Sequence, residues 1–235
     1  MDPFEFTFSY TKNEYGKHKI TTSASYYYPS QLTLLLESRN NCKIDNDRLS
    51  INLLLLISST TFIESILCEN IQNVIEVQKH RENNELTWNM IKSYEDSLSN
   101  ATFKNYNKIA KDILGVGLNG LTSSETWESI NILFTLRNQI VHGRDLSWEL
   151  NYFAEDLPVG EFSKNYKQAI DYLVKQSLIV KEPSFLNHIL TDSVTDFFIE
   201  KTKIFFIDVS TSIEKKYKID IRDAFGFLIH ILQEK

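Results

Sequence analysis

Residues 121–144 read LTSSETWESINILFTLRNQIVHGR, and this stretch predicts one long amphipathic helix. Thr122 and Glu125 have the spacing of a capping box, so we expect the helix to begin here. Gly143 suits the left-handed position that ends such a helix. In between, apolar residues recur at steps of three and four, the pattern of a helix packed on a core: Trp127, Ile130, Leu133, Phe134, Leu136, Ile140 and Val141.

The polar residues of this predicted helix are arranged as a narrow stripe. Steps of four, three and four place four of them on one face: Asn131, Thr135, Asn138 and His142. Arg137 lies beside the stripe, and its long side chain can reach toward His142. An imidazole with an ordinary pKa of about 6.5 both gives and takes protons near neutral pH. Because a guanidinium matches the oxygens of a phosphate, the combination suits phosphodiester chemistry.

The run RNQIVHG, residues 137–143, resembles the signature of the HEPN superfamily. These are all-helical domains in which an R-(N/D/H)-x-x-x-H motif marks metal-independent ribonucleases. The alternative is a surface arginine followed by a histidine near the end of the helix, where the helix dipole favours the charged imidazole.

The composition favours a mainly helical protein, because seven Gly and four Pro leave few turn signals in 235 residues. A chain of this length can bury a full core as one domain with an appendage, or as two small ones. The longest apolar run, residues 51–57, is too short to span a bilayer, and no signal peptide is evident. Cys42 and Cys68 lack metal-ligand or redox spacing and fit a reducing cytosol. We therefore expect a cytoplasmic protein with no metal, no cofactor and no membrane contact.

The net charge of −6 argues against a protein that coats nucleic acid without specificity. It allows a ribonuclease that contacts a few nucleotides through a local basic patch. The alternative for each lysine in such a patch is a solvated helix face. The candidate residues are Arg137, Arg144, Lys104, Lys108 and Lys111.

Residues 1–45 are expected to hold a small β-hairpin and a short helix. FEFTFSY and KITTSASYYY, within residues 4–28, are rich in aromatic and β-branched residues, with TKNEYGKH as turn material between them. A lone hairpin is marginally stable, so it should pack on the helices or pair with another edge. The helix should cover about residues 29–37, and the polar segment SRNNCKIDND should connect it to the rest.

Residues 46–235 are expected to form a helical domain with a C-terminal helical extension. Its first helix should span about residues 47–78, with Asp47 as N-cap. The segment INLLLLISSTTFIESILCENIQNVI is apolar nearly all round, as expected for a helix at the centre of a bundle.

Glu64 is a carboxylate in the middle of this apolar helix, and a buried carboxylate is costly unless it is paired. The segment FIESILCEN resembles the first core helix of many HEPN proteins, where an acidic residue faces the Arg–His motif. We therefore expect Glu64 to pair with Arg137 or His142. The alternative places Glu64 on a solvent-facing strip with Glu69 and Gln72.

Further helices follow from apolar periodicity. One, over residues 103–114, should lie antiparallel to the motif helix because the connection between them is short. Residues 80–100 should be a surface loop with a helical turn around Trp88, and residues 143–163 an irregular stretch beside the site. His188 and His230 sit among apolar residues and are read as core or interface histidines. The later helices are expected at residues 164–178, 185–212 and 221–232.

The HEPN resemblance covers about residues 47–178. It implies an up-and-down helical bundle, usually a homodimer in which the two motif helices face each other. It also implies cleavage of single-stranded RNA by attack of the substrate's own 2′-hydroxyl. His142 would be the general base or acid, Arg137 would stabilise the phosphoryl oxygens, Asn138 would orient the phosphate or the imidazole, and Glu64 would hold Arg137 or His142 in place. Further substrate contacts are expected from Asn131, Thr135 and Arg144.

Two rival interpretations remain open at this point. The first is a HEPN domain that binds a nucleotide or a nucleotidyltransferase-type antitoxin but does not cut RNA. The second is a helical interaction protein in which the motif is accidental, so that substitutions at Arg137 or His142 change only stability. A role in toxin–antitoxin or phage-defence systems is implied by the resemblance alone.

Overall fold

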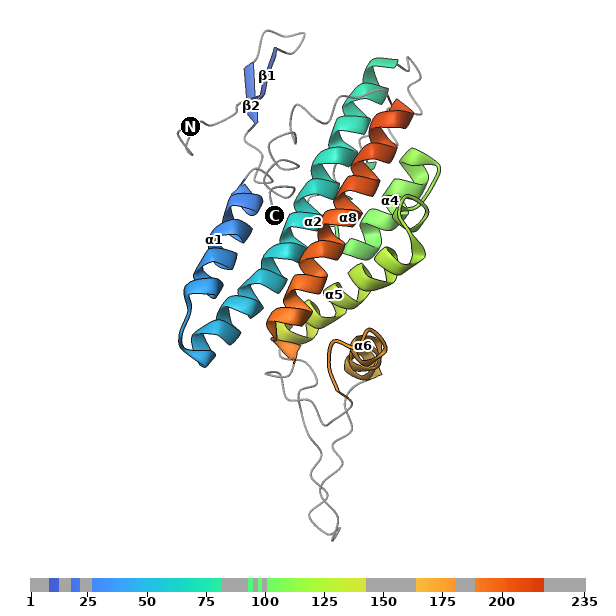
Figure 1. Ribbon diagram of the computed structural model, residues 1–235. Helices are drawn as coiled ribbons and strands as arrows, with labels where there is room; N and C mark the ends of the chain where they lie inside the picture. The colour runs from blue at the N-terminus through green and yellow to red at the C-terminus, as the bar shows by residue number, and fades with distance from the viewer. Residues whose placement is uncertain are drawn as a thin grey trace.

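The computed structural model describes residues 9–12, 18–21, 27–81, 93–94, 97–98, 101–142, 164–180 and 189–217. Within these ranges, the side chains of both strands and of residues 73, 76–81, 142, 164–165 and 217 are left undescribed. The described part is mainly α, with six helices packed as a bundle (Figure 1). The helices are α1 (Tyr27–Asn41), α2 (Asp45–Arg81), α4 (Phe103–Leu114), α5 (Ser124–His142), α6 (Lys164–Lys175) and α8 (Asp192–Tyr217), with a 3-10 turn η2 (Leu118–Gly120) before α5.

Two short strands lie where the hairpin is expected. β1 (Ser9–Lys12) pairs antiparallel with β2 (His18–Thr21), in a register that places Tyr10 opposite Ile20. The expected packing of this hairpin on the helices, or its pairing with another strand edge, remains a prediction.

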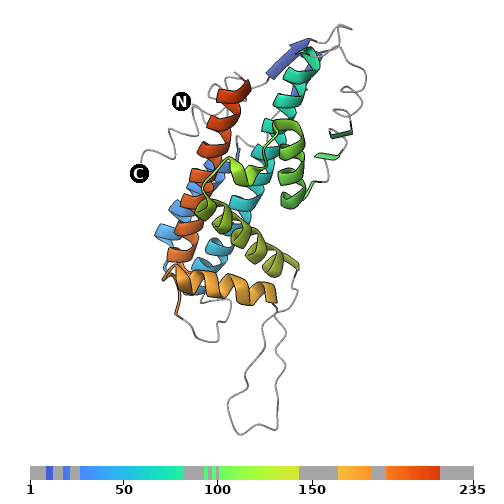
Figure 2. The ribbon, with the colours of Figure 1, turned by 90° about the vertical axis from the view of Figure 1, so that its right-hand side faces the viewer.

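Helix α2 is the central element of the bundle. Figure 1 shows α8 beside it and α1 on its other flank, while Figure 2 shows α5 and α6 crossing near one end. Helices α2 and α8 run in the same direction, because Asn52 lies beside the start of α8 and Phe62 packs on Phe206 further along both helices. The expectation of an apolar helix at the bundle's centre is confirmed.

The core joins α2, α4, α5 and α8 through large apolar side chains. The rings of Phe103 and Phe134 stack with centroids 4.1 Å apart and join α4 to α5. The rings of Phe62 and Phe206, 5.8 Å apart, join α2 to α8. Such pairs add to the burial of apolar area that stabilises the fold.

Most of α2 also satisfies a length and hydropathy criterion for a membrane span. The segment Asp45–Gln72 has a mean hydropathy of 1.8, and 56% of the window is buried inside the bundle. The core helix of a soluble protein passes the same test. The apolar run of residues 51–57 is therefore part of a longer apolar helix than run length alone suggests.

The boundaries of α1 and α2 differ from the prediction. Helix α1 extends to Asn41, beyond the predicted end near residue 37, and α2 begins at Asp45, so Asp47 lies inside its first turn and is not the N-cap. The polar segment read as a connector is helical in part because Arg39 is buried, with only 5% of its surface exposed. Local polarity therefore gave the wrong boundary.

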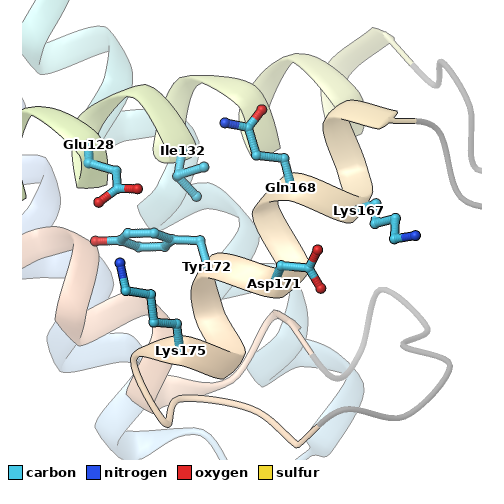
Figure 3. A pocket seen from close by; sticks show the side chains of 7 residues that line it. All are labelled: Glu128, Ile132, Lys167, Gln168, Asp171, Tyr172 and Lys175. Carbon is cyan, nitrogen blue, oxygen red and sulfur yellow. The ribbon is translucent and has the colours of Figure 1, made fainter.

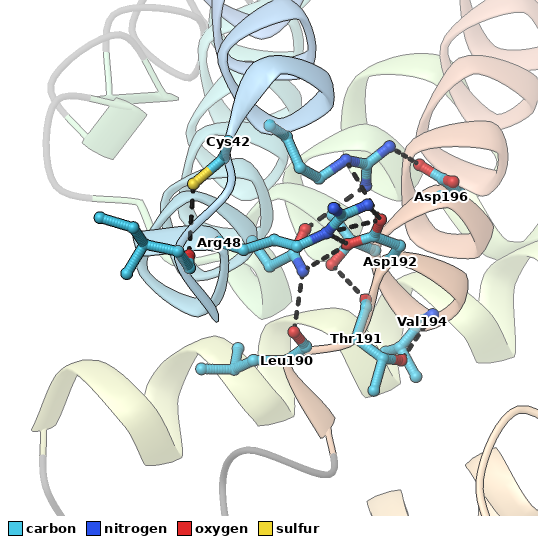
Figure 4. Close-up of polar contacts among 11 residues, drawn as sticks. Cys42, Arg48, Leu190, Thr191, Asp192, Val194 and Asp196 are labelled. Atoms are coloured by element: carbon cyan, nitrogen blue, oxygen red, sulfur yellow. Dashed lines mark hydrogen bonds and ion pairs between the residues drawn. The ribbon is translucent and has the colours of Figure 1, made fainter. Parts of the chain in front are cut away.

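The partners of Arg39 explain its burial (Figure 4). Its Nη2 donates to the Asp196 carboxylate at 2.7 Å, and its Nη1 donates to Asn52 Oδ1 at 3.4 Å. Asp192, at the start of α8, accepts hydrogen bonds from Arg48 and from Asn52. Hydrogen bonds from Arg48 lower the pKa of Asp192 to about 2, so this carboxylate is ionised across the physiological range. We call these five residues the α1–α2–α8 polar network, since it links those three helices.

Helix α5 begins close to the predicted position but by different contacts. The N-cap is Ser123, whose hydroxyl accepts a hydrogen bond from a first-turn backbone amide at 3.1 Å. Thr122 instead donates to Asp208 at 2.6 Å, and Glu125 pairs with Lys201 at 2.5 Å. The predicted Thr122–Glu125 capping box is therefore wrong, because both side chains are engaged by α8.

Helix α4 matches the predicted residues 103–114. Thr102 caps its first turn, and Gly115 ends it in the left-handed conformation with φ of 74°. Lys216 of α8 donates to the carbonyl of Leu114, at the end of the same helix. This contact satisfies one of the carbonyls that a helix C-terminus leaves unpaired.

Helix α6 ends three residues before the predicted position. The residue that takes the left-handed conformation just after the helix is not a glycine. Ser177 has φ of 58°, and Leu178 N donates to Leu173 O at 3.0 Å, as in a Schellman motif. Because glycine adopts this conformation without a Cβ clash, Ser177→Gly should raise the free energy of unfolding by about 0.5–1 kcal/mol.

Denaturant midpoints of the wild type, Ser177→Gly and Ser177→Ala would test this expectation. Alanine keeps the Cβ, so it should give no gain. Equal midpoints for the glycine and alanine variants would contradict the backbone explanation.

Several predictions lie outside the described residues. These are the end of the motif helix at Gly143, the stretch 143–163, the turn around Trp88, the region 185–188, and the last helix over residues 221–232, together with His188 and His230. Helix α8 is described from Asp192 to Tyr217, against a prediction of residues 185–212.

Candidate functional site

Arg137 of α5 and Glu64 of α2 are electrostatically coupled. The charge of Arg137 lowers the pKa of Glu64, while burial raises it by more, so the net shift is upward. Among the described residues the two side chains form no direct ion pair. Glu64 is half-buried. Its predicted pairing with Arg137 or His142 stays a prediction.

Asn138 holds the tip of the arginine side chain. Arg137 Nη1 donates to Asn138 Oδ1 at 2.9 Å, and Asn138 itself is exposed. Arg137 Nε is buried and has no hydrogen-bond partner within the described part of the chain. The guanidinium therefore extends from a buried Nε to a tip that Asn138 holds at the surface.

Asn131 and Thr135 are engaged within α5. The Asn131 amide donates to Trp127 O at 2.8 Å, and the Thr135 hydroxyl donates to Asn131 O at 2.8 Å. Such back-bonding is the ordinary arrangement for short polar side chains inside a helix. The structure does not bring these two residues to Glu64 and Arg137, so their contact with substrate remains a prediction.

His142 is the last residue of α5, and the structure describes its backbone only. It lies five residues after Arg137, which corresponds to about 7.5 Å along the helix axis. Arg144 falls outside the described residues. The predicted meeting of Arg137 with His142 therefore stays a prediction, while the meeting of Arg137 with Asn138 is observed.

No family model, curated protein or solved structure matches this chain. The likeness to HEPN domains therefore rests on the motif of residues 137–143 and on the segment FIESILCEN alone.

Two residues near Glu64 were missed by the sequence analysis. Tyr106 of α4 is only 4% exposed, and its hydroxyl is hydrogen-bonded to the thiol of Cys68, one helical turn after Glu64. Burial raises the pKa of Tyr106 strongly, and both Cys68 and Glu64 act in the same direction. Burial also raises the pKa of Cys68, which keeps the thiol protonated. Together with Arg137, these side chains form what we call the α2–α4–α5 polar cluster.

A sequence signal for this cluster existed. Glu64 and Cys68 are four residues apart, so they share one face of α2. Tyr106 is a residue with a polar tip inside an otherwise apolar stripe, and a buried tyrosine hydroxyl usually finds a partner. Only the packing of α4 on α2 shows which partner it has.

The described residues include no group of three or more His, Cys, Asp or Glu side chains that could hold a metal ion. The three lysines proposed for a basic patch, Lys104, Lys108 and Lys111, are all exposed on α4. Their arrangement agrees with the alternative of a solvated helix face.

Proposed function

We propose that this chain is a metal-independent endoribonuclease of the HEPN type, acting on single-stranded RNA. The observation that supports the proposal best is the arrangement around Arg137. Its guanidinium is held by Asn138 at 2.9 Å, is balanced by the half-buried Glu64, and lies five residues before His142 on the same helix. A guanidinium and an imidazole carried by the same helix suit a reaction at a phosphate.

In the proposed reaction the 2′-oxygen of the substrate attacks the adjacent phosphorus, and the bond from phosphorus to the 5′-oxygen of the next nucleotide breaks. His142 takes the proton of the 2′-hydroxyl or supplies one to the leaving 5′-oxygen. Arg137 stabilises the charge that builds on the phosphoryl oxygens, and Asn138 orients the guanidinium of Arg137. The products carry a 2′,3′-cyclic phosphate and a 5′-hydroxyl.

Glu64 has the role of a positioning residue in this proposal. A carboxylate on α2 opposite the guanidinium keeps Arg137 directed along the α2–α5 contact, because the charges attract across a partly desolvated space. Since no direct ion pair ties the two side chains, Arg137 can bind a phosphate without first breaking one.

The proposed assembly is a homodimer in which the two copies of α5 face each other. Val141, in the last turn of α5, is 47% exposed, and Asn138 beside it is also exposed. Both would be covered by a second copy of the helix. An up-and-down HEPN bundle, a cytoplasmic location, an antitoxin or other regulatory partner, and a role in toxin–antitoxin or phage-defence systems follow from the motif resemblance.

Cleavage of a mixed pool of single-stranded RNA in the presence of a chelator tests the reaction. We expect the purified chain to cut the pool and to leave 2′,3′-cyclic phosphate ends, detectable by mass spectrometry. Oligonucleotides with a single 2′-deoxy position should resist cleavage at that position only, because the nucleophile is missing there. Products with 3′-hydroxyl ends, or cleavage at the 2′-deoxy position, would exclude this mechanism.

A further inference from the structure

An open groove with a volume of about 400 Å³ lies between α5 and α6 (Figure 3). Helix α5 contributes Glu128 and Ile132 to its lining. Helix α6 contributes charged and amide side chains along its length: Lys167, Gln168, Asp171 and Lys175. The groove therefore combines these charged and amide side chains with an apolar surface, to which Ile132 and the Tyr172 ring contribute and which makes up most of its lining.

The groove lies on the face of α5 that continues to His142. Steps of four, three, four and three connect Glu128, Ile132, Thr135, Gln139 and His142, so all five share one side of the helix. Ile132 precedes His142 by about 15 Å along the axis. Figure 3 shows Glu128 and Lys175 on either side of the Tyr172 ring at one end of the groove, while Lys167 lies toward the opposite end, where α5 continues to its C-terminus. The backbone of His142 therefore lies about 15 Å beyond the lining of the groove along the axis of α5.

The wall of the groove is fixed in position. The hydroxyl groups of Tyr172 and Ser129 lie 2.6 Å apart, which connects α6 to α5. Tyr172 is largely buried, and its ring both packs the two helices together and lines the groove.

The side chains of the groove divide into two chemical kinds. The ammonium groups of Lys167 and Lys175 suit phosphate oxygens, which position a nucleic acid without reading its sequence. The carboxylates of Glu128 and Asp171 accept hydrogen bonds from the amino groups of bases, and the amide of Gln168 both donates and accepts. Single-stranded RNA exposes those base edges and is the form of RNA that proteins read by sequence.

We propose that the α5–α6 groove binds the nucleotides that flank the scissile phosphate and selects bases that carry an amino group over uracil. The inference rests on the proposed ribonuclease function for its catalytic consequence. The mixture of two cations with two carboxylates also agrees with a chain of net charge −6, which cannot rely on a general positive field.

Binding of 2′-O-methyl RNA dodecamers, which cannot be cleaved through the 2′-oxygen, tests the groove without activity. The double variant Lys167→Ala, Lys175→Ala should bind at least about tenfold more weakly at low salt. For this variant the slope of log K against log salt concentration should be shallower than for the wild type by about 1.4. Each lost phosphate contact on a single strand removes about 0.7 from that slope. The control is Lys43→Ala, Lys215→Ala, which removes two exposed lysines outside the groove and should bind as the wild type does.

Base preference is tested with Asp171→Asn, using dodecamers that differ by cytosine or uracil at one position. The wild type should prefer cytosine, and the variant should lose about tenfold of that preference because an amide no longer provides two acceptors. The matched control is Glu37→Gln, an exposed carboxylate of α1.

The outcomes separate the two proposals. If the wild type cleaves RNA while the groove variants bind and discriminate as it does, the groove proposal is overturned and the ribonuclease stands. If the wild type binds through Lys167 and Lys175 but never cleaves, the groove stands and the ribonuclease falls. If the wild type binds no dodecamer, the groove proposal fails.

Discussion

Cleavage of RNA by the Arg137→Gln variant should be about 10²–10³-fold slower than by the wild type, the usual cost of removing one group that stabilises transition-state charge. Glutamine keeps a donor that can reach Asn138, so the substitution removes the cation with little change of the local hydrogen bond. The measurement is the single-turnover rate on one oligonucleotide, with saturating enzyme.

A second readout of the same variant does not depend on activity. Arg137 lowers the pKa of Glu64 while burial raises it, so removing the cation should raise that pKa further above the ordinary value of 4.5. A carboxyl group with a raised folded-state pKa gives stability that is fully present below the unfolded pKa and lost as pH rises through the folded pKa. Arg137→Gln should therefore lose more stability than the wild type as pH rises above about 4.5.

The pKa of Glu64 is measured by carbon-13 NMR of its carboxyl group, with Glu64→Gln for assignment. The loss of stability with rising pH is measured by unfolding at several pH values. An unchanged Glu64 pKa in Arg137→Gln would contradict the electrostatic partnership. A changed pKa with wild-type cleavage would keep the partnership and remove Arg137 from the chemistry.

His142→Ala completes this comparison. Loss of a general acid or base costs about 10²–10⁴-fold. Val180→Ala, at an exposed residue outside α5, is the control and should cleave at the wild-type rate. The oligomeric state of both variants is measured by light scattering beside the activity.

Arg39→Ala should lower the free energy of unfolding by about 2–3 kcal/mol, below the 3–5 kcal/mol typical of breaking a fully buried ion pair. The expected loss is smaller than for a fully buried ion pair because the partners of Arg39 are partly exposed. The side chains of Asp196 and Asp192 are 57% and 32% exposed, so water screens their attraction to the arginine. The loss combines the packing of the buried arginine stem with the contacts to Asp196 and Asn52. Chemical denaturation with a two-state fit gives the value.

Arg48→Ala is the control for Arg39→Ala. Arg48 also contacts Asp192, but its side chain is 41% exposed, so its loss should cost much less than the loss of Arg39. Equal losses for the two variants would mean that burial of Arg39 does not distinguish them. A loss below about 0.5 kcal/mol for Arg39→Ala, the range of ordinary surface substitutions, would remove the α1–α2–α8 polar network from the account of stability.

Helical periodicity predicted much of the bundle. It placed α4 at residues 103–114 and located α2, α5 and α6 within a few residues of their observed bounds. It succeeded because these helices bury apolar stripes, and a stripe is visible in one sequence. Glu64 was singled out by the same logic, since a carboxylate within an apolar pattern must find compensation.

Contacts between distant segments explain the errors. Thr122 and Glu125 look like a capping box, yet their partners lie in α8, 86 and 76 residues away. Arg39 looks like a surface residue of a connector until Asp196 is placed beside it. Tyr106 looks like one apolar position among several until its hydroxyl meets Cys68. In each case the deciding partner is fixed by packing, which no local pattern encodes.

The hydrogen bond between Arg39 and Asp196 joins residues 157 positions apart. During synthesis on a ribosome at about 5–20 residues per second, roughly 8–30 s would pass between the appearance of the arginine and that of its partner. During that interval α8 has not yet been made. The nascent chain therefore exposes the surface of α1 and the apolar flank of α2 that the folded bundle buries. Chaperone dependence and aggregation during expression should therefore depend on how quickly the last third of the chain is made.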